Sequence, residues 1–274
     1  MRIWGKVLGA FFGFLLGNIF GALLGLWLGH RFDRGMGMSF RRAPTQQQQA
    51  VFFHATFAVM GHIAKASGQV TEQEIRVASN LMDRMRLSGE QRVRAQESFR
   101  QGKESGFPLR ETLAEFRQAS QGQRDILRFF LEVQLQAAFA DGCVEADERA
   151  ILQTIADELG FSRIELARIL AMAEAQMNFF KHGQGQYQGG GQGQQYRQEA
   201  PSKDRLKDAY QLLGVSESDS DQEIKRAYRK EMSKHHPDKL AAKGLPPEMM
   251  EMAKEKTQEI QQAWEWIREA RGIR

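Results

Sequence analysis

An uncharged segment near the start of the chain restricts its fold more than any other feature. Residues 7–29 carry no charged side chain, and Asn18 is the one polar side chain among them. As a helix rising ~1.5 Å per residue, the segment reaches about 35 Å, which is enough to cross a hydrocarbon core of ~30 Å. A cleaved signal peptide usually has a shorter apolar region and an A-x-A-like cleavage site, and neither fits here. We therefore predict an uncleaved transmembrane helix at 7–29, between a short flank at 1–6 and a juxtamembrane segment at 30–45.

The charges around this segment bear on its orientation. Arg2, Lys6 and the terminal amine precede it, whereas arginines follow it at positions 31, 34, 41 and 42. Lysine and arginine are enriched on the cytoplasmic side of membrane proteins. The small excess of cations after the segment favours a cytoplasmic C-terminal side.

Glycine recurs at every fourth position through the same segment. A glycine in a helix interior costs about 1 kcal/mol relative to alanine, so helix propensity does not explain the pattern. Membrane helices are glycine-rich in general, but small residues four apart also let two helix backbones approach closely. The unbroken register favours helix association and predicts dimerisation through Gly5, Gly9, Gly13, Gly17, Gly21, Gly25 and Gly29.

Composition narrows the class of the rest of the chain. The 274 residues include a single cysteine, Cys143, which excludes an intramolecular disulfide and a Cys-rich zinc module. The formal net charge of +4 argues against an obligate nucleic-acid binder. Neither a P-loop nor a dinucleotide-binding glycine motif is present, so no cofactor is expected. Long stretches of Glu, Lys, Arg, Gln, Ala and Leu, with six prolines in all, predict an all-α protein.

Residues 46–181 predict a bundle of short helices. Apolar residues at helical spacing, such as Ile126 and Phe130, indicate core positions. Turn-forming residues are expected to separate the helices at 67–68, 87–89, 105–108, 121–122, 141–142 and 160–162. An internal repeat aligns 64–74 with 138–148, and each copy has a glycine turn before a capped helix start.

The second copy of the repeat is acidic and raises the question of a metal site. Set against an EF-hand loop, Ala137 and Phe139 fall at the first two ligand positions and cannot bind calcium. We therefore interpret the acids as residues that cap the start of a helix, where they lie at the positive end of the helix dipole, and we expect no metal ligands. The region resembles the TerB-like helical domain, and some TerB-like domains are associated with metal binding. The first copy, with Ser67 and Thr71, lacks most of the acids.

Residues 182–201 differ in composition from both neighbours. Glycine and glutamine make up almost all of the stretch from Gly183 to Gln195. Such a segment cannot bury a hydrophobic core, so it predicts a flexible tether. Tracts of Gln, Gly and Tyr can also aggregate, but this one is short.

Local signals mark the helices of the C-terminal part, residues 202–274. Ser220, followed three residues later by Glu223, predicts a capping box at the start of one helix. Pro247 suits the first turn of the next helix. Apolar residues recur at helical spacing on both, which indicates that each helix buries one face.

The tripeptide His236-Pro237-Asp238 stands in a predicted loop between these two helices. The helix before it carries Lys and Arg on one face, and clustered cations steer and orient an acidic partner. Pro237 fixes the backbone at one point, and Asp238 offers a carboxylate suited to a guanidinium. His236 as a catalytic base is the competing interpretation, but no Ser, Cys or second His in a triad-like arrangement accompanies it.

This helix–loop–helix pattern resembles a J-domain, and Asp208–Val215 matches the first helix and turn of that family. A J-domain presents its second helix and loop to the nucleotide-binding domain and interdomain linker of an Hsp70 and stimulates ATP hydrolysis. The resemblance implies that binding of a DnaK-like Hsp70 uses Lys225, Tyr228, Arg229, Lys230, His236, Pro237, Asp238 and Lys239. The chain departs from the family at Glu231 and Ser233, where leucine-like residues are usual, and at Thr257, where phenylalanine is common.

The order of the segments is itself informative. An all-α chain is expected, with a single N-terminal transmembrane helix, a TerB-like helical bundle, a Gln/Gly tether and a C-terminal J-domain helical hairpin. That order resembles the DjlA-type membrane-anchored DnaJ-like co-chaperones of bacteria. The resemblance implies a non-enzymatic, single-pass inner-membrane protein with a periplasmic N-terminus and cytoplasmic domains. It would recruit a cytosolic Hsp70, trigger its ATPase and form a homodimer through the anchor. The alternative is a membrane-bound metal-binding or stress-response protein led by the TerB-like domain.

Overall fold

The computed structural model of the protein describes most of the chain beyond residue 44, namely 45–66, 68, 71–139, 144–184 and 203–273. Regular structure in these ranges is helical, and all of it belongs to one compact unit. The predicted membrane segment with its seven glycines, and most of the predicted tether, lie outside the described residues. Among the helices that are described, none combines the length and apolarity that a membrane crossing requires.

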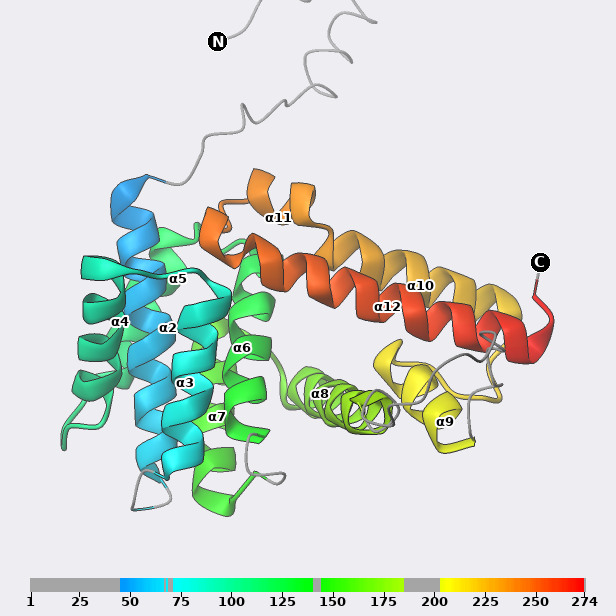
Figure 1. Cartoon of the computed structure of the whole chain (residues 1–274), viewed down its shortest axis with the longest axis horizontal. Helices are drawn as coiled ribbons and strands as arrows, with labels where there is room; N and C mark the ends of the chain where they lie inside the picture. The colour runs from blue at the N-terminus through cyan, green and yellow to red at the C-terminus, as the bar shows by residue number, and fades with distance from the viewer. Residues whose placement is uncertain (1–44, 67, 69–70, 140–143, 185–202, 274) are drawn as a thin grey trace, which may run out of the picture. The chain divides into compact units, whose positions relative to one another are not determined.

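The central region forms a helical bundle, as predicted (Figure 1). Its helices are α2 (Gln46–Ala66), α3 (Glu72–Arg84), α4 (Gly89–Gly102), α5 (Leu109–Ala119), α6 (Arg124–Ala138), α7 (Ala146–Leu159) and α8 (Arg163–Gln184). Every predicted break that the structure describes falls at a junction between two of these helices, whereas 141–142 lies outside the described residues. Helix α8 continues three residues past the predicted domain end at 181.

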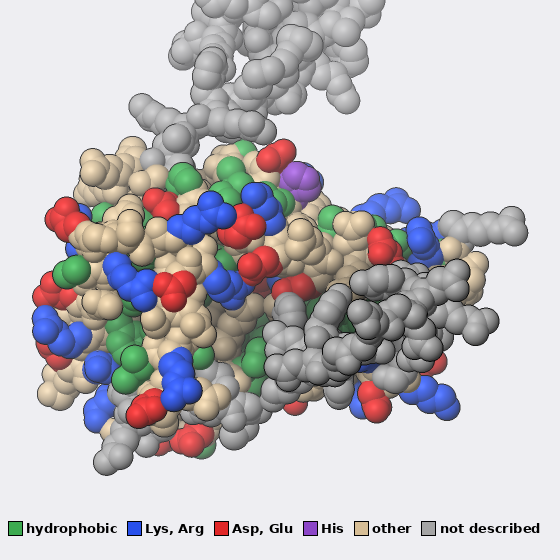
Figure 2. All heavy atoms as spheres, in the orientation of Figure 1, with side chains coloured by type: hydrophobic (Ala, Val, Ile, Leu, Met, Phe, Trp, Pro, Cys, Tyr) green, Lys and Arg blue, Asp and Glu red, His purple; other side chains and the backbone are tan. Residues whose placement is uncertain are grey.

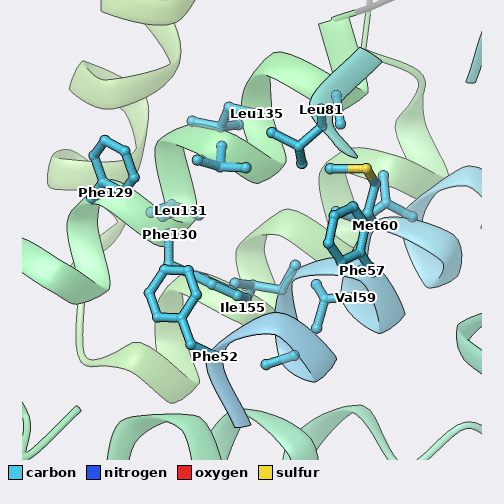
Figure 3. Close-up of a cluster of buried hydrophobic side chains, with 14 of the residues drawn as sticks. Phe52, Phe57, Val59, Met60, Leu81, Phe129, Phe130, Leu131, Leu135 and Ile155 are labelled. Atoms are coloured by element: carbon cyan, nitrogen blue, oxygen red, sulfur yellow. The ribbon is translucent and has the colours of Figure 1, made fainter. Parts of the chain in front are cut away.

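Helix α6 supplies much of the core of this bundle (Figure 3). Phe130, Leu131 and Leu135 are fully buried there. Phe130 stacks on Phe116 of α5 with ring centroids 4.2 Å apart, and Phe52 of α2 meets Phe116 edge-on at 5.3 Å. Aromatic pairs of these geometries add about 0.5–1.5 kcal/mol beyond the burial of their surface. The aromatic cluster therefore joins α2 to the consecutive helices α5 and α6, which follow it more than 40 residues later.

Helices α2 and α4 cross at very short range because glycine stands at the crossing. A Cβ atom on Gly61 would lie 2.1 Å from the carbonyl oxygen of Phe99. A Cβ atom on Gly102 would lie 1.8 Å from the carbonyl oxygen of Ala58. Both distances are far inside van der Waals contact with backbone atoms, so the crossing requires glycine at both positions.

Both copies of the predicted repeat begin a helix in a similar way. The Glu74 backbone N–H donates to Thr71 Oγ1 at 3.2 Å, and the Thr71 N–H donates to Glu74 Oε2 at 2.7 Å, which confirms the predicted capping box. In the second copy, the Glu145 N–H donates to Glu148 Oε2 at 2.9 Å. These acids satisfy backbone donors at the starts of α3 and α7.

The C-terminal region contains α9 (Lys203–Leu212), α10 (Asp221–His235), α11 (Pro237–Ala242), η2 (Pro247–Met249) and α12 (Met250–Arg271). Helices α10 and α12 lie side by side (Figure 1), and Ile224, Ile260 and Ile267 are fully buried in one cluster with residues of α9. The predicted capping box at Ser220 is present, and Pro247 begins the short 3₁₀ turn that leads into α12.

The tripeptide region differs from the predicted loop. Pro237 is the first residue of α11, because its fixed φ suits the first turn of a helix and its missing N–H is not needed there. The Asp238 backbone N–H donates to His236 Nδ1 at 3.2 Å. His236, with φ −58° and ψ 124°, is therefore the single non-helical residue between α10 and α11.

Candidate functional site

Charged side chains of both signs are mixed on the face of the molecule that Figure 2 shows. Lys and Arg side chains lie next to Asp and Glu side chains over the central bundle on that face. Proteins that bind nucleic acid usually gather their cations into a stripe or patch. A clearer grouping of cations occurs on one helix, α10.

The side of α10 opposite its buried residue Ile224 carries a row of cations. Arg226, Arg229 and Lys230 are exposed, and Lys225 is half-buried. At ~100° per residue, these four positions lie roughly 100–240° around the helix from Ile224. The burial of Ile224 therefore turns the cations toward solvent, where they create a positive potential for an approaching partner.

Tyr228 lies at the border of this row. Its ring stacks on Trp264 of α12, with centroids 5.0 Å apart and an interplanar angle of 15°. The side chain is half-buried, so one part of it packs while another remains accessible. The stack fixes α10 against α12 at the point where the exposed cations begin.

The junction of α10 and α11 holds Asp238 at the surface. The backbone N–H groups of Lys239 and Leu240 both donate to the His236 carbonyl oxygen at 3.0 Å. Leu240 is fully buried and anchors the turn, while Lys239 Nζ donates to Ser233 Oγ and ties α11 back to α10. Asp238 itself is exposed, so its carboxylate is available to a donor on a partner.

The imidazole of His236 supports this turn. Because Nδ1 accepts the Asp238 N–H, Nε2 is the ring nitrogen left to donate. The ring is exposed and caps the start of α11. Within the described ranges, no group of three or more His, Cys, Asp or Glu side chains is arranged to hold a metal ion. The exposed ring and the exposed carboxylate of Asp238 suit recognition of a partner.

The structure brings the predicted Hsp70-binding residues together on α10 and the turn after it. Arg229, Lys230, His236, Asp238 and Lys239 are exposed, and the other three are half-buried. The outer face, as it is called from here on, comprises Lys225, Tyr228, Arg229, Lys230, His236, Pro237, Asp238 and Lys239. The seven glycines predicted to mediate dimerisation are outside the described residues.

The departures from the J-domain pattern have individual explanations. Ser233 is exposed and accepts the hydrogen bond from Lys239. Thr257 is half-buried, and its hydroxyl bonds to a carbonyl of its own helix. The Glu231 side chain is 2% exposed, and its Oε2 lies 3.1 Å from Nη2 of Arg128 on α6. Sequence reasoning missed Arg128, although a carboxylate at an apolar helix position indicates a buried cationic partner.

Known protein families match the chain in three successive segments. Residues 1–42 match the family described as "Co-chaperone DjlA transmembrane domain". Residues 53–171 match "Tellurite resistance protein TerB", and residues 208–272 match "DnaJ domain". The last segment contains the whole outer face.

The chain is also similar to curated proteins over its full length. It is 56% identical to the Co-chaperone protein DjlA of Photobacterium profundum, across 99% of this chain and 100% of that protein. The proteins of the same description from Aliivibrio fischeri and Yersinia pseudotuberculosis are 54% and 53% identical, across 100% of both chains in each case. No solved structure matches the chain.

Proposed function

Because the chain belongs to the DjlA family of co-chaperones, we propose that its J-domain binds a cytosolic, DnaK-like Hsp70 and stimulates ATP hydrolysis by that chaperone. Members of the family act on a chaperone and are not enzymes, so the chemistry of ATP takes place on the Hsp70. The observation that carries the proposal is the outer face, on which the exposed cations of α10 lead directly to the exposed carboxylate of Asp238.

The outer face can act in two stages. The cations of α10 attract an acidic surface from a distance and align it, which raises the rate and specificity of encounter. Asp238 then accepts a charge-assisted hydrogen bond from a guanidinium on the partner. Because Leu240 anchors the turn, little conformational freedom remains to be lost on binding. Stimulation follows if the J-domain binds the hydrolysing conformation of the Hsp70 more tightly than its resting one.

The proposal extends to the location of the protein. The anchor would cross the bacterial inner membrane once, with the N-terminus in the periplasm and the TerB-like domain and J-domain in the cytoplasm. Its support is the family match at residues 1–42, the uncharged run at 7–29, and the excess of arginines after that run. Protease digestion of inside-out and right-side-out vesicles tests it, because cleavage of the J-domain in right-side-out vesicles alone would reverse the orientation.

The proposal also includes a homodimer formed through the anchor. Glycine at every fourth position would let two membrane helices pack closely. Replacement of Gly13, Gly17 and Gly21 by leucine should abolish self-association in membranes. The substitutions Ala10→Leu, Ala22→Leu and Leu24→Ala serve as controls, because these positions do not belong to the glycine pattern. Unchanged association of the triple glycine variant would contradict a role for the glycines.

The Hsp70 function is tested with the full-length chain in lipid nanodiscs. His236→Gln should abolish most of the stimulation of single-turnover ATP hydrolysis by a DnaK-like Hsp70, because the cap of α11 and the ring's outward donor are both altered. His54→Gln on α2 is the matched control and should stimulate normally. Equal stimulation by His236→Gln and the unchanged chain would refute the proposed function.

A further inference from the structure

We propose that the central bundle is a docking surface for the J-domain of the same chain, and that a buried ionic cluster between α6 and α10 holds the outer face in one orientation. The seam cluster, as we call it, consists of Arg128 and Glu132 on α6 and of Glu231 and His235 on α10. That the outer face binds Hsp70 rests on the proposed function, whereas the docking itself does not involve Hsp70.

Apolar side chains from both regions are buried together. Leu240, Leu245 and Met249, which follow α10, are almost fully buried in the same cluster as the core of the central bundle. Phe179 of α8 packs against Trp266 of α12 with ring centroids 4.5 Å apart. Burial of this surface supplies the non-directional part of the docking.

The seam cluster supplies the directional part. Arg128 Nε lies 2.8 Å from Glu132 Oε1 on its own helix, and Arg128 Nη2 lies 3.1 Å from Glu231 Oε2 on α10. His235 stands between the two carboxylates, with Nδ1 3.5 Å from Glu132 Oε2 and Nε2 3.7 Å from Glu231 Oε2. Lys234 Nζ lies 2.7 Å from Glu231 Oε1. The four side chains of the cluster are between 2% and 13% exposed.

Both carboxyls of the cluster favour the ionised form. Burial alone would raise the pKa of Glu231, but the neighbouring His235, Arg128 and a lysine outweigh it and hold that pKa well below its usual range. The pKa of Glu132 is lowered in the same way, against burial, by His235 and Arg128. Each helix therefore brings a buried charge whose partner stands on the other helix. Removal of one partner would leave the other charge buried with one opposite charge fewer, because Lys234 would remain beside Glu231, or Glu132 beside Arg128.

The register of α10 keeps the docked side apart from the outer face. At ~100° per residue, Glu231 and His235 lie within about 20° of Ile224 around the helix. The cations Arg229 and Lys230 point to the other side and are exposed. The docked J-domain is thus presented to a partner rather than sheltered from it.

Further polar contacts fix the docked orientation at several separate points. They are the ion pairs Lys243–Asp125 and Arg84–Glu255, the hydrogen bond from Lys256 Nζ to Gln176 Oε1, and the hydrogen bond from Arg168 Nη2 to the Gly214 carbonyl oxygen at 2.9 Å. The two ion pairs are partly exposed, so each contributes little stability. Their spread over several elements instead restricts rotation of the J-domain on the bundle.

Substitutions in the seam cluster separate this inference from a chance contact. Arg128→Met leaves Glu231 without its partner on α6, and Glu231→Leu leaves Arg128 without its partner on α10. Glu231→Leu also restores the leucine-like residue typical of J-domains at this position, so an undocked J-domain should tolerate it. The double variant replaces the Arg128–Glu231 pair by an apolar pair of similar volume, which is often neutral or stabilising. Glu132 loses Arg128 in this variant but keeps Lys256 as a cationic neighbour.

The test measures the distance between the central bundle and the J-domain. Two spin labels are attached to the full-length chain carrying Cys143→Ser, one at Val93→Cys on α4 and one at Gln222→Cys on α10. Val93 is 58% exposed, and Gln222 is exposed. The labelled chain is diluted with unlabelled chain in nanodiscs, so that distances within one chain dominate. We expect one narrow distance for the unchanged seam, and a docked-to-undocked ratio about a hundredfold lower or more in each single variant.

The outcomes are distinct. The double variant should recover the narrow distance, and the exposed-site controls Arg163→Met and Glu269→Leu should keep it. A broad distribution with the unchanged seam, or a narrow one in both single variants, overturns the proposal. If a single variant loses helix content, its distance cannot be interpreted and the folded double variant is used instead. A broad distance distribution in the double variant also overturns the proposal. No Hsp70 is present, so failure of the His236→Gln test would refute the proposed function and leave this result standing.

Discussion

On α10, Arg229 and Lys230 stand in solvent, whereas the next residue, Glu231, has a 2% exposed side chain and is paired with Arg128 of another region. Exposed charges contribute about 0–1 kcal/mol to stability and remain free to meet a partner. Buried charges depend on each other, and removal of one is strongly destabilising. One helix can therefore carry recognition on one side and positioning on the other, because each residue turns it by ~100°.

Loss of the buried cation should have the largest effect. Arg128→Met is expected to destabilise the protein by about 3–5 kcal/mol, because Glu231 and Glu132 would remain buried with one fewer cation. Denaturant unfolding of the chain measures this change. The exposed Arg163→Met should remain within about 0.5 kcal/mol of the unchanged chain. Equal stabilities of the two variants would contradict the inference that the buried charges of α6 and α10 contribute more to stability than exposed charges do.

A further buried carboxyl, Glu259 on α12, sharpens the comparison because it lacks an adequate partner. Glu259 shares a small pocket with Glu132 and Lys256, and its Oε2 has no hydrogen-bond partner among the described residues. Burial raises its pKa to about 7, more than the charge of Lys256 lowers it. The opposite directions for Glu231 and Glu259 show that pairing, rather than burial, decides which buried acid remains ionised.

Stability should follow pH accordingly. The pKa of Glu259 is higher in the folded state than its ordinary value of 4.5, so folding is favoured by the bound proton and stability falls as pH rises from 4.5 to about 7. Glu259→Gln should remove this loss of stability. The change in unfolding free energy caused by the substitution should therefore be more favourable at pH 8 than at pH 4 by about 3 kcal/mol. Melting temperatures at both pH values measure it, with the exposed Glu265→Gln as control. The same dependence of stability on pH in the variant and in the unchanged chain would contradict the assignment.

On the outer face, Asp238→Asn should change function without changing stability. The amide keeps the size of the side chain but loses the negative charge that a guanidinium would bind, so stimulation of Hsp70 should fall by about tenfold or more. Stability should remain within about 0.5 kcal/mol, since Asp238 is exposed. Asp204→Asn, at an exposed acid of α9, is the control. Normal stimulation by the Asp238 variant would remove this carboxylate from the proposed site.

The smallest effect is expected for one cation of the outer face. Lys230→Ala should weaken Hsp70 binding by roughly 0.5–1 kcal/mol, a factor of about two to five, through a slower association rate. The difference should shrink as salt is raised, because screening weakens attraction between exposed charges. Stopped-flow association at two salt concentrations tests this. A salt-independent difference would indicate a packing role for Lys230 instead.

The sequence predicted features that local residues determine. The capping boxes at Thr71 and Ser220 depend on side chains three residues apart, and both are present. Apolar residues at helical spacing predicted that each of the two C-terminal helices buries one face, and Ile224 and Ile260 on those faces are fully buried. The outer face was predictable too, since His236 and its neighbours are contiguous with the helix that carries the cations.

Features that depend on distant residues escaped prediction. Arg128 and Glu231 are 103 positions apart, and nothing local to either indicates the other. Glu231 was recognised as a departure from the J-domain pattern, but its partner lies in a different domain. The helical start at Pro237 was mistaken for loop, because the cap is an uncommon one, the Nδ1 of His236.

Helix α8 has a consequence for how tightly the seam must bind. It carries Phe179, which packs on the J-domain, and it ends at Gln184, so the covalent link to Lys203 starts from the docking surface itself. Two domains joined by a short tether have an effective local concentration on the order of 1 mM. A seam with an intrinsic dissociation constant of only ~10 µM would then be closed in about 99% of molecules. Free J-domain added at micromolar concentration would hardly displace the J-domain of the same chain. The seam can therefore be weak as an isolated interface and still keep the two domains docked within one chain.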